Sequence, residues 1–354
     1  MRSAASGYNR FLIIIAVLGM TGCASYIGER IVRAPNIDRP NGIFGKEMDA
    51  AWESDVAKHF LVERTRIRAP ADDVELKVSV LPAGNYPSRA SIEQEDGSIE
   101  LGLQAGMPVG PPRGPPKGTV VTVHGWKGES RAMLFHAMEM AAHGWDVVLY
   151  DQRGHGQSGG ERITFGMREA RDLEAVMAWT RSRPEYSPPL ILFGTSMGAS
   201  TALMAAAESD PHAIVAVAPY ARVDQVLPRA LRRFSPVLLQ PFLTDRRMRR
   251  ALAHAESLSG VDFDDDAPIR SAAEVDAPVL LVYSRTDRLI PPEHGRELER
   301  ALPNARLHWM ADHSHEALMV DRDAVLPAVL PWLDATLTAT AASGQSPGND
   351  PGEK

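Results

Sequence analysis

A serine flanked by glycines, in Gly194-Thr195-Ser196-Met197-Gly198, is the strongest candidate for a reactive group in the sequence. The apolar run LILF precedes it and the small-residue run ASTALMAAA follows it, which predicts a sharp turn between a buried strand and a helix. Such a turn presents the serine hydroxyl at the end of the strand, above a helix N-terminus that favours developing negative charge. Ser196 is therefore the candidate nucleophile, and the N–H of Met197 is a candidate donor to an oxyanion.

Two histidines, His313 and His315, stand two residues apart in ADHSHEALMV. On a strand they could share a metal ion, but a metallo-hydrolase pair of this kind would want a following Asp-His and distant histidine ligands. No Asp-His follows the pair, so no metal is expected. Either histidine could be a general base facing Ser196, because both are expected in a loop at the carboxyl edge of the sheet. Both could also be ordinary surface residues.

Asp287, in VYSRTDRLIPP, is the candidate acid. An aspartate in a loop at the carboxyl end of a strand can accept the imidazole N–H and hold the tautomer that serves as base. The alternative is that Asp287 only caps the turn that follows.

These residues must be positioned by elements that alternate regularly from residue 119 onward. Apolar strands without a polar face alternate with helical segments, which predicts an α/β class with a mostly parallel sheet covered on both faces. Upstream, residues 60–84 predict two antiparallel strands with a turn at 70–73. Residues 85–118 are rich in Pro and Gly and predict a long loop. The expected strands are TVVTVHG, WDVVLYD, LILFGTS, AIVAVAPY, APVLLVYS and ARLHWM.

The sequence predicts a globular domain over residues 46–339, with a cap at about 221–272 that has no strand pattern. From Arg222 to Arg250 the cap has eight arginines against two aspartates, together with several large apolar residues. Such a segment is either a solvated helical face or a surface for an anionic membrane or lipidic substrate. Residues 340–354 are expected to be a disordered tail.

The N-terminus has the pattern of a secretory signal. Arg2 and Arg10 precede the ten-residue apolar run FLIIIAVLGM, and the chain's single cysteine, Cys23, follows shortly after. The run is short for a membrane span and resembles, with MTGC, the lipobox of bacterial lipoproteins. We therefore expect a signal peptide over 1–22, a lipidated Cys23, a tether over 23–45 and a lipid-anchored protein of the cell envelope. Ala24 favours the periplasmic side of an outer membrane where one exists. A plain secretory signal is the alternative.

Over most of Arg64–Leu337 the sequence resembles the α/β-hydrolase family, closest to its monoacylglycerol-lipase-like and serine-aminopeptidase-like branch. The resemblance implies an α/β-hydrolase fold with a mostly parallel eight-stranded sheet, helices on both faces and a small helical cap. It also implies a Ser-His-Asp mechanism with an acyl-enzyme, and Trp126 as a second oxyanion donor. The matching segments are VHGWKGES, YDQRGHGQSGG, TFGMREARDLEAVMAW, FGTSMG, APVLLVYSRTDRLIPP and SHEAL.

The resemblance bears on each histidine differently. SHEALMVD resembles the H-E-x-L stretch of the lipase-like branch and favours His315, whereas MADH resembles the G-A-G-H ending of other branches and selects His313. His315 is the preferred base and His313 the alternative. By the same resemblance, His124 orders the loop that carries Trp126.

Several other functions are disfavoured. The net charge of −7 gives no indication of nucleic-acid binding. GHGQSG fits a dinucleotide motif, but no small-residue helix follows at once and no acid ends a second strand, so NAD is rejected and no cofactor is expected. The preferred function is carboxylic ester hydrolysis of a small-molecule or lipid-like substrate. The alternatives are a serine peptidase or amidase, and a hydrolase-like envelope protein that only binds.

Overall fold

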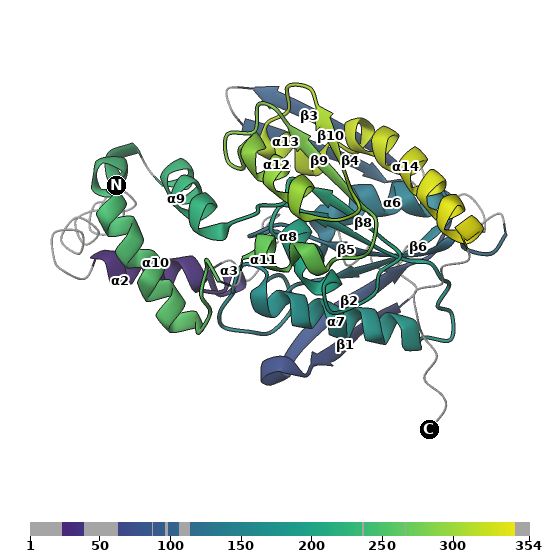
Figure 1. Ribbon diagram of the computed structural model, residues 1–354, viewed down its shortest axis with the longest axis horizontal. Helices are drawn as coiled ribbons and strands as arrows, with labels where there is room; N and C mark the ends of the chain where they lie inside the picture. The colour runs from purple at the N-terminus through teal and green to yellow at the C-terminus, as the bar shows by residue number, and fades with distance from the viewer. Residues whose placement is uncertain are drawn as a thin grey trace, which may run out of the picture.

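The centre of the molecule is an eight-stranded sheet with strand order β1-β2-β6-β5-β7-β8-β9-β10 (Figure 1). The computed structural model describes residues 23–38, 63–86, 88–95, 98–105, 114–235, 237–265 and 267–343. Strand β2 pairs antiparallel with β1 and β6, and all other neighbours pair in parallel, which confirms the predicted mostly parallel sheet. The strands are β1 (Glu63–Ala69), β2 (Val74–Leu81), β5 (Gly118–Val123), β6 (Trp145–Tyr150), β7 (Leu190–Thr195), β8 (Ala213–Val217), β9 (Val279–Ser284) and β10 (Ala305–Met310).

Helices cover both faces of the sheet because its central strands are apolar on both sides. Every residue of β5 to β9 is buried. One face packs against α6 (Leu134–Ala142) and α14 (Arg322–Ser343). The other packs against α7 (Met167–Ser182), α8 (Met197–Ala206) and α12 (Pro292–Ala301). Burial of Val, Leu and Ile from alternate strand positions is the main force that holds these layers together.

The last helix, α14, is longer than the sequence predicts. It is long and apolar enough to cross a membrane by length and composition alone, but Val325, Val329 and Leu333 are buried against the sheet. It runs to Ser343, so residues 340–343 of the expected tail are helical, and 344–354 lie outside the described residues.

The prediction of a long loop over residues 85–118 is wrong in part. Strands β3 (Ser88–Glu95) and β4 (Ser98–Ala105) pair antiparallel there as a separate two-stranded sheet. Asp96-Gly97 stands between the two strands, and this dipeptide is a strong signal for a two-residue hairpin loop. The many Pro and Gly residues in the same segment favoured a loop and outweighed that signal.

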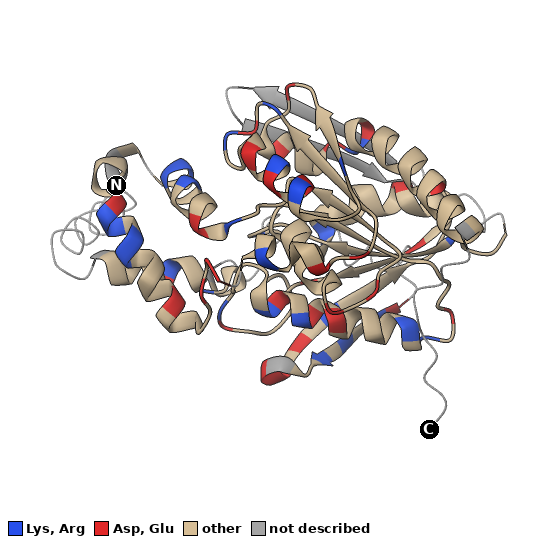
Figure 2. Ribbon diagram, in the orientation of Figure 1, with Lys and Arg blue, Asp and Glu red and all other residues tan. Residues whose placement is uncertain are grey.

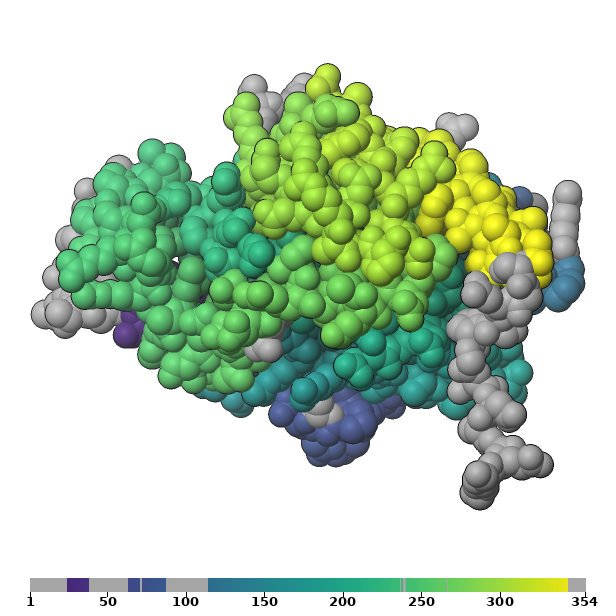
Figure 3. Space-filling view, viewed as in Figure 1, coloured from purple at the N-terminus to yellow at the C-terminus, as the bar shows by residue number. Residues whose placement is uncertain are grey.

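The cap between β8 and β9 is helical. Figure 2 shows that Lys and Arg residues, coloured blue on the ribbon, occur along α9 and α10. In the space-filling view the same helices form a lobe beside the body that contains the sheet (Figure 3). The elements of this segment are α9 (Val223–Phe234), η4 (Val237–Phe242), α10 (Asp245–Ser259), α11 (Pro268–Ser271) and η5 (Ala272–Glu274).

The segment expected to be a tether instead contains two helices, α2 (Cys23–Val32) and α3 (Pro35–Asp38). Helix α2 lies side by side with α10 of the cap (Figure 1). Ile27 and Ile31 are buried in the core that this contact extends. The approach is close, because a Cβ added at Gly28 would lie 2.5 Å from the carbonyl oxygen of Ala251. Residues 39–45 and the expected signal peptide over 1–22 lie outside the described residues.

Candidate active site

Ser196 occupies a strained turn between β7 and α8. Its backbone has φ 51° and ψ −119°, a region that a non-glycine residue adopts only when the surrounding structure holds it there. Its N–H donates to the carbonyl oxygen of Val217 at 2.8 Å, which fixes the turn against β8. The serine hydroxyl therefore projects at the carboxyl edge of the sheet.

The two glycines of the turn are required by packing. A Cβ at Gly198 would lie 2.1 Å from the carbonyl oxygen of Val123, and one at Gly194 would lie 2.5 Å from that of Gly198. Both contacts are with backbone, which has no room to move aside. The strand–turn–helix pattern thus brings α8 directly against β5 and the turn itself.

A continuous hydrogen-bonded chain joins Ser196, His315 and Asp287. His315 Nε2 lies 3.0 Å from Ser196 Oγ, and His315 Nδ1 lies 2.7 Å from Asp287 Oδ2. The other carboxylate oxygen of Asp287 accepts the N–H groups of Leu289 and Ile290, both at 2.8 Å. A neutral imidazole with its proton on Nδ1 satisfies both contacts, because Nε2 is then free to accept the serine proton.

The two histidines of the ADHSHEALMV stretch have different partners. His315 opens helix α13 (His315–Val320), and Ser314 Oγ caps that helix by accepting the N–H of Ala317 at 3.2 Å. The Nε2 atom of His313 lies 3.3 Å from Asp321 Oδ2, outside the chain that contains Ser196. No three His, Cys, Asp or Glu side chains of the described residues are grouped as ligands for one metal ion.

The loop after β5 lies beside the serine. A Cβ added at Gly125 would lie 3.4 Å from Ser196 Cβ, and Trp126 follows directly. The Trp126 ring packs edge-on against Phe165 with the ring centroids 5.5 Å apart. Met197 is the first residue of α8, so its N–H has no acceptor within the helix. The two N–H groups predicted as oxyanion donors thus belong to segments that flank Ser196.

Two buried histidines hold this loop, and the sequence predicts this role only for the first. His124 Nε2 accepts the N–H of Gln152 at 3.0 Å, and its Nδ1 lies 2.9 Å from the carbonyl oxygen of Gly125. His155 Nε2 accepts the N–H of Lys127 at 3.2 Å. Burial lowers the pKa of His124 and lowers that of His155 to about 3, so both rings are neutral and can accept. The sequence did contain an indication of this role for His155. The residue lies in a Gly-His-Gly turn, and a buried loop needs polar side chains as hydrogen-bond partners for its backbone groups.

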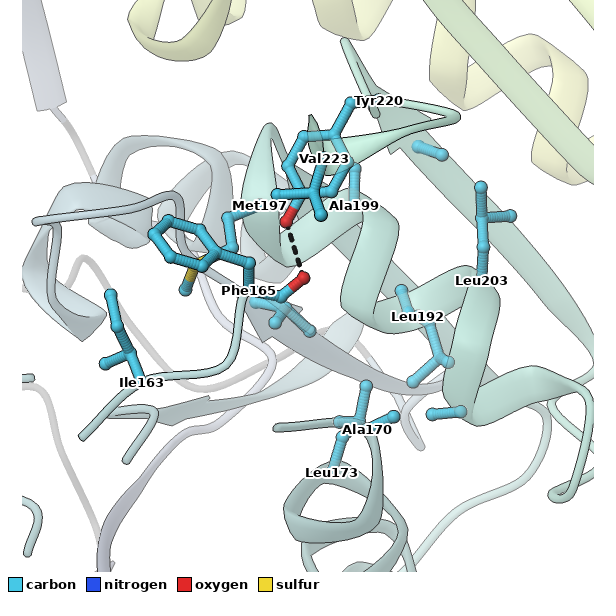
Figure 4. Close-up of a cluster of buried hydrophobic side chains, with 14 of the residues drawn as sticks. Ile163, Phe165, Ala170, Leu173, Leu192, Met197, Ala199, Leu203, Tyr220 and Val223 are labelled. Atoms are coloured by element: carbon cyan, nitrogen blue, oxygen red, sulfur yellow. Dashed lines mark hydrogen bonds between the residues drawn. The ribbon is translucent and has the colours of Figure 1, made fainter. Parts of the chain in front are cut away.

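The base of the site is a packed cluster in which Met197 and Ala199 of α8 face Phe165 and Tyr220 (Figure 4). Tyr220 Oη donates to the carbonyl oxygen of Phe165 at 2.7 Å, and burial raises the tyrosine pKa well above its usual value. Ser200 Oγ accepts the N–H of Tyr220 at 2.9 Å. These bonds tie the start of the cap to the helix that carries the serine turn.

Comparison with known proteins finds a family model and several proteins with similar sequences. The family model described as serine aminopeptidase, S33, matches residues 114–260. The uncharacterized protein YqkD of Bacillus subtilis is 28% identical over 49% of this chain, and the match spans only 57% of YqkD. The AB hydrolase superfamily protein YisY of the same organism is 25% identical over 58% of this chain and 88% of its own length.

Two solved structures extend the likeness to most of the chain. The Pyrococcus furiosus esterase Pf2001 superimposes with a TM-score of 0.58 at 22% identity, covering 78% of this chain and 93% of the esterase. A thermophilic esterase from Thermogutta terrifontis gives a TM-score of 0.51 at 16% identity, covering 78% of this chain and 99% of the esterase. At these identities the likeness establishes a shared fold.

Proposed function

We propose that this chain, which has the α/β-hydrolase fold, is a serine hydrolase that cleaves carboxylic esters of small or lipid-like molecules. The observation that carries the proposal is the buried hydrogen-bonded chain from Ser196 through His315 to Asp287. The esterases among the structural neighbours are consistent with an ester as the substrate bond.

In the proposed mechanism, Ser196 Oγ attacks the ester carbonyl while His315 Nε2 takes its proton. The carbonyl oxygen becomes an oxyanion, which the N–H groups of Met197 and Trp126 stabilise. Asp287 holds the imidazole in position and stabilises its positive charge. His315 then gives the proton to the departing alcohol, which leaves an acyl-enzyme. Water attacks that intermediate by the same steps in reverse, with His315 again as the base.

The test is reaction with a fluorophosphonate probe, which labels a serine only when a base activates it. We expect stoichiometric labelling of the wild-type chain and none of Ser196→Ala. The control is Ser200→Ala, because Ser200 is on the same helix but bonds to the backbone of Tyr220. Absence of wild-type labelling, or equal labelling of Ser196→Ala, would favour a protein that binds without turnover.

A serine peptidase or amidase is the second candidate, favoured by the description of the matching family model. A pair of substrates with the same acyl group separates the two: para-nitrophenyl esters and para-nitroanilides. We expect turnover of the esters. Anilide cleavage with a comparable kcat/KM would favour the peptidase.

We also infer that the protein is lipid-anchored at the cell envelope through Cys23. The inference rests on the charged and apolar pattern of residues 1–22 and on the single cysteine that follows it. Cells fed a labelled fatty acid should incorporate it into the wild-type chain, and the protein should sediment with membranes. Cys23→Ala should lose the label. If the variant keeps both the label and the membrane fraction, the anchor is elsewhere.

A further inference from the structure

A cavity of about 280 Å³ lies beside His315. Three segments form it: the loop after β9, the residues that open α13, and the end of cap helix α9. The residues that line it are Arg233, Thr286, Arg288, Leu289, Ser314, His315 and Glu316.

The wall of the cavity is held in place by hydrogen bonds. Asp287 Oδ1 accepts the N–H groups of Leu289 and Ile290, which fixes the backbone on either side of Arg288. Thr286 Oγ1 donates to the carbonyl oxygen of His313 at 3.1 Å, which joins the loop after β9 to the loop before α13. The backbone from which Arg288 projects is thus held by hydrogen bonds to the carboxylate that also contacts His315.

The cavity carries an excess of positive charge. Arg233 Nη2 lies 2.9 Å from Glu316 Oε1, so these two charges balance each other. Arg288 lines the same cavity, is exposed, and has no hydrogen bond or ion pair with the described residues. An exposed guanidinium without a carboxylate is free to bind an oxyanion of a ligand, and its planar fork suits a carboxylate or phosphate.

The position of the cavity indicates which part of a substrate would enter it. In the proposed mechanism His315 Nε2 gives its proton to the leaving group, so that group must lie next to the imidazole. The cavity is lined by His315, whereas the described residues Ser196, Met197 and Trp126, which would surround the acyl carbonyl, do not line it.

We propose that this cavity binds the leaving group of the substrate, and that Arg288 selects a leaving group with a carboxylate or phosphate. The inference rests on the proposed function, because it takes His315 as the proton donor. The substrate class is then an ester whose alcohol part carries an anionic group one short spacer away from the ester oxygen.

The test compares three acetate esters on the full chain: para-acetoxybenzoate, its neutral methyl ester, and para-acetoxyphenyl phosphate. For each variant the kcat/KM of an anionic ester is divided by that of the neutral ester. This ratio cancels differences in folding and active fraction. Comparing the ratio between variants cancels the intrinsic reactivity of the esters.

We expect Arg288→Gln to lower the ratio by about tenfold, the size expected for one partly exposed charge-assisted hydrogen bond. The anion whose ratio falls more, carboxylate or phosphate, is the preferred class. Arg285→Gln is the matched control: Arg285 is on the same loop but lies over the Trp309 ring, 4.8 Å from its centroid, and does not line the cavity. Its ratio should match that of the wild type.

An unchanged ratio in Arg288→Gln would overturn the proposal. A second substrate pair places the charge on the acyl side instead: mono-para-nitrophenyl succinate and para-nitrophenyl butyrate. Arg288→Gln could change the ratio of kcat/KM for the succinate to that for the butyrate and leave the leaving-group ratio unchanged. In that case the assignment of the cavity to the leaving group would be wrong. Failure of the wild type to hydrolyse any ester would count against the proposed function, which separates the two failures.

Discussion

The imidazole of His315 and the carboxylate of Asp287 face each other at 2.7 Å, and both side chains are almost completely buried. In the proposed mechanism this contact keeps the imidazole proton on Nδ1. An asparagine at 287 would keep the shape but could also donate to Nδ1, which would favour the wrong tautomer. Asp287→Asn should therefore lower kcat for ester hydrolysis by roughly 10⁴-fold.

The measurement is steady-state hydrolysis of para-nitrophenyl acetate, with circular dichroism to verify folding. The control is Asp312→Asn, an exposed aspartate in the nearby loop, which should keep wild-type activity. A loss of less than tenfold in Asp287→Asn would show that this carboxylate is not an essential partner.

His313 and His315 should respond differently to substitution. His315→Ala removes the group that contacts Ser196 and should abolish both turnover and fluorophosphonate labelling. His313→Ala removes contacts of the ring with Asp321 and with the carbonyl oxygen of Ala311, neither of which involves Ser196 or Asp287. It should retain activity within a fewfold of wild type. If His313→Ala abolished labelling and His315→Ala retained it, His313 would be the base instead.

His136 should destabilise the protein as the pH falls. It is fully buried, neither ring nitrogen has a hydrogen-bond partner among the described residues, and burial lowers its pKa to about 4. The unfolded chain binds a proton near pH 6.5 that the folded protein excludes. The contribution of neutral His136 to the free energy of unfolding is therefore fully present above about pH 6.5 and is lost as the pH falls towards 4.

The variant that isolates this effect is His136→Leu, because it removes the titrating ring from an apolar site beside Phe193. Its melting temperature should exceed that of the wild type by a few degrees at about pH 7, and the gap should widen towards pH 4. Melting curves across this range give the comparison. A gap that does not change with pH would mean that His136 has no part in acid destabilisation.

Gly28 should be intolerant of a side chain. A Cβ there would lie 2.5 Å from the carbonyl oxygen of Ala251, so Gly28→Leu must push α2 away from α10. We expect a loss of about 1–3 kcal/mol in the free energy of unfolding, typical of an overpacked contact. Denaturant unfolding measures it, with Ser25→Ala on the exposed face of α2 as the control. Equal stability of the two variants would show that the helices separate without cost.

The sequence predicted best those features in which a short local motif has a fixed position in the fold. The motif Gly194-x-Ser196-x-Gly198 predicted the turn. Both glycines lie so close to neighbouring backbone that no side chain fits at either position. The choice between His313 and His315 depended on side-chain direction, which two residues of spacing do not specify. The structure directs His315 towards Ser196 and Asp287, and directs His313 towards Asp321.

Features that depend on distant partners were not predictable in the same way. The burial of α2 depends on α10, and the Arg233–Glu316 pair joins the cap to α13. In each case, the sequence around one partner contains no pattern that identifies the other partner. The β3–β4 hairpin is different, since its Asp-Gly signal was present but was outweighed by the Pro-rich residues after it.

The contact between α2 and α10 also constrains how the chain folds. Ile27 and Ile31 emerge early in synthesis, whereas Ala251 and Ala255, which lie against Gly28, emerge late. Until then the apolar stripe of α2 has no permanent partner on the cap, and such a stripe attracts other unfinished chains. The contact between α2 and α10 therefore joins segments that are far apart in the chain, and it cannot form until both are available.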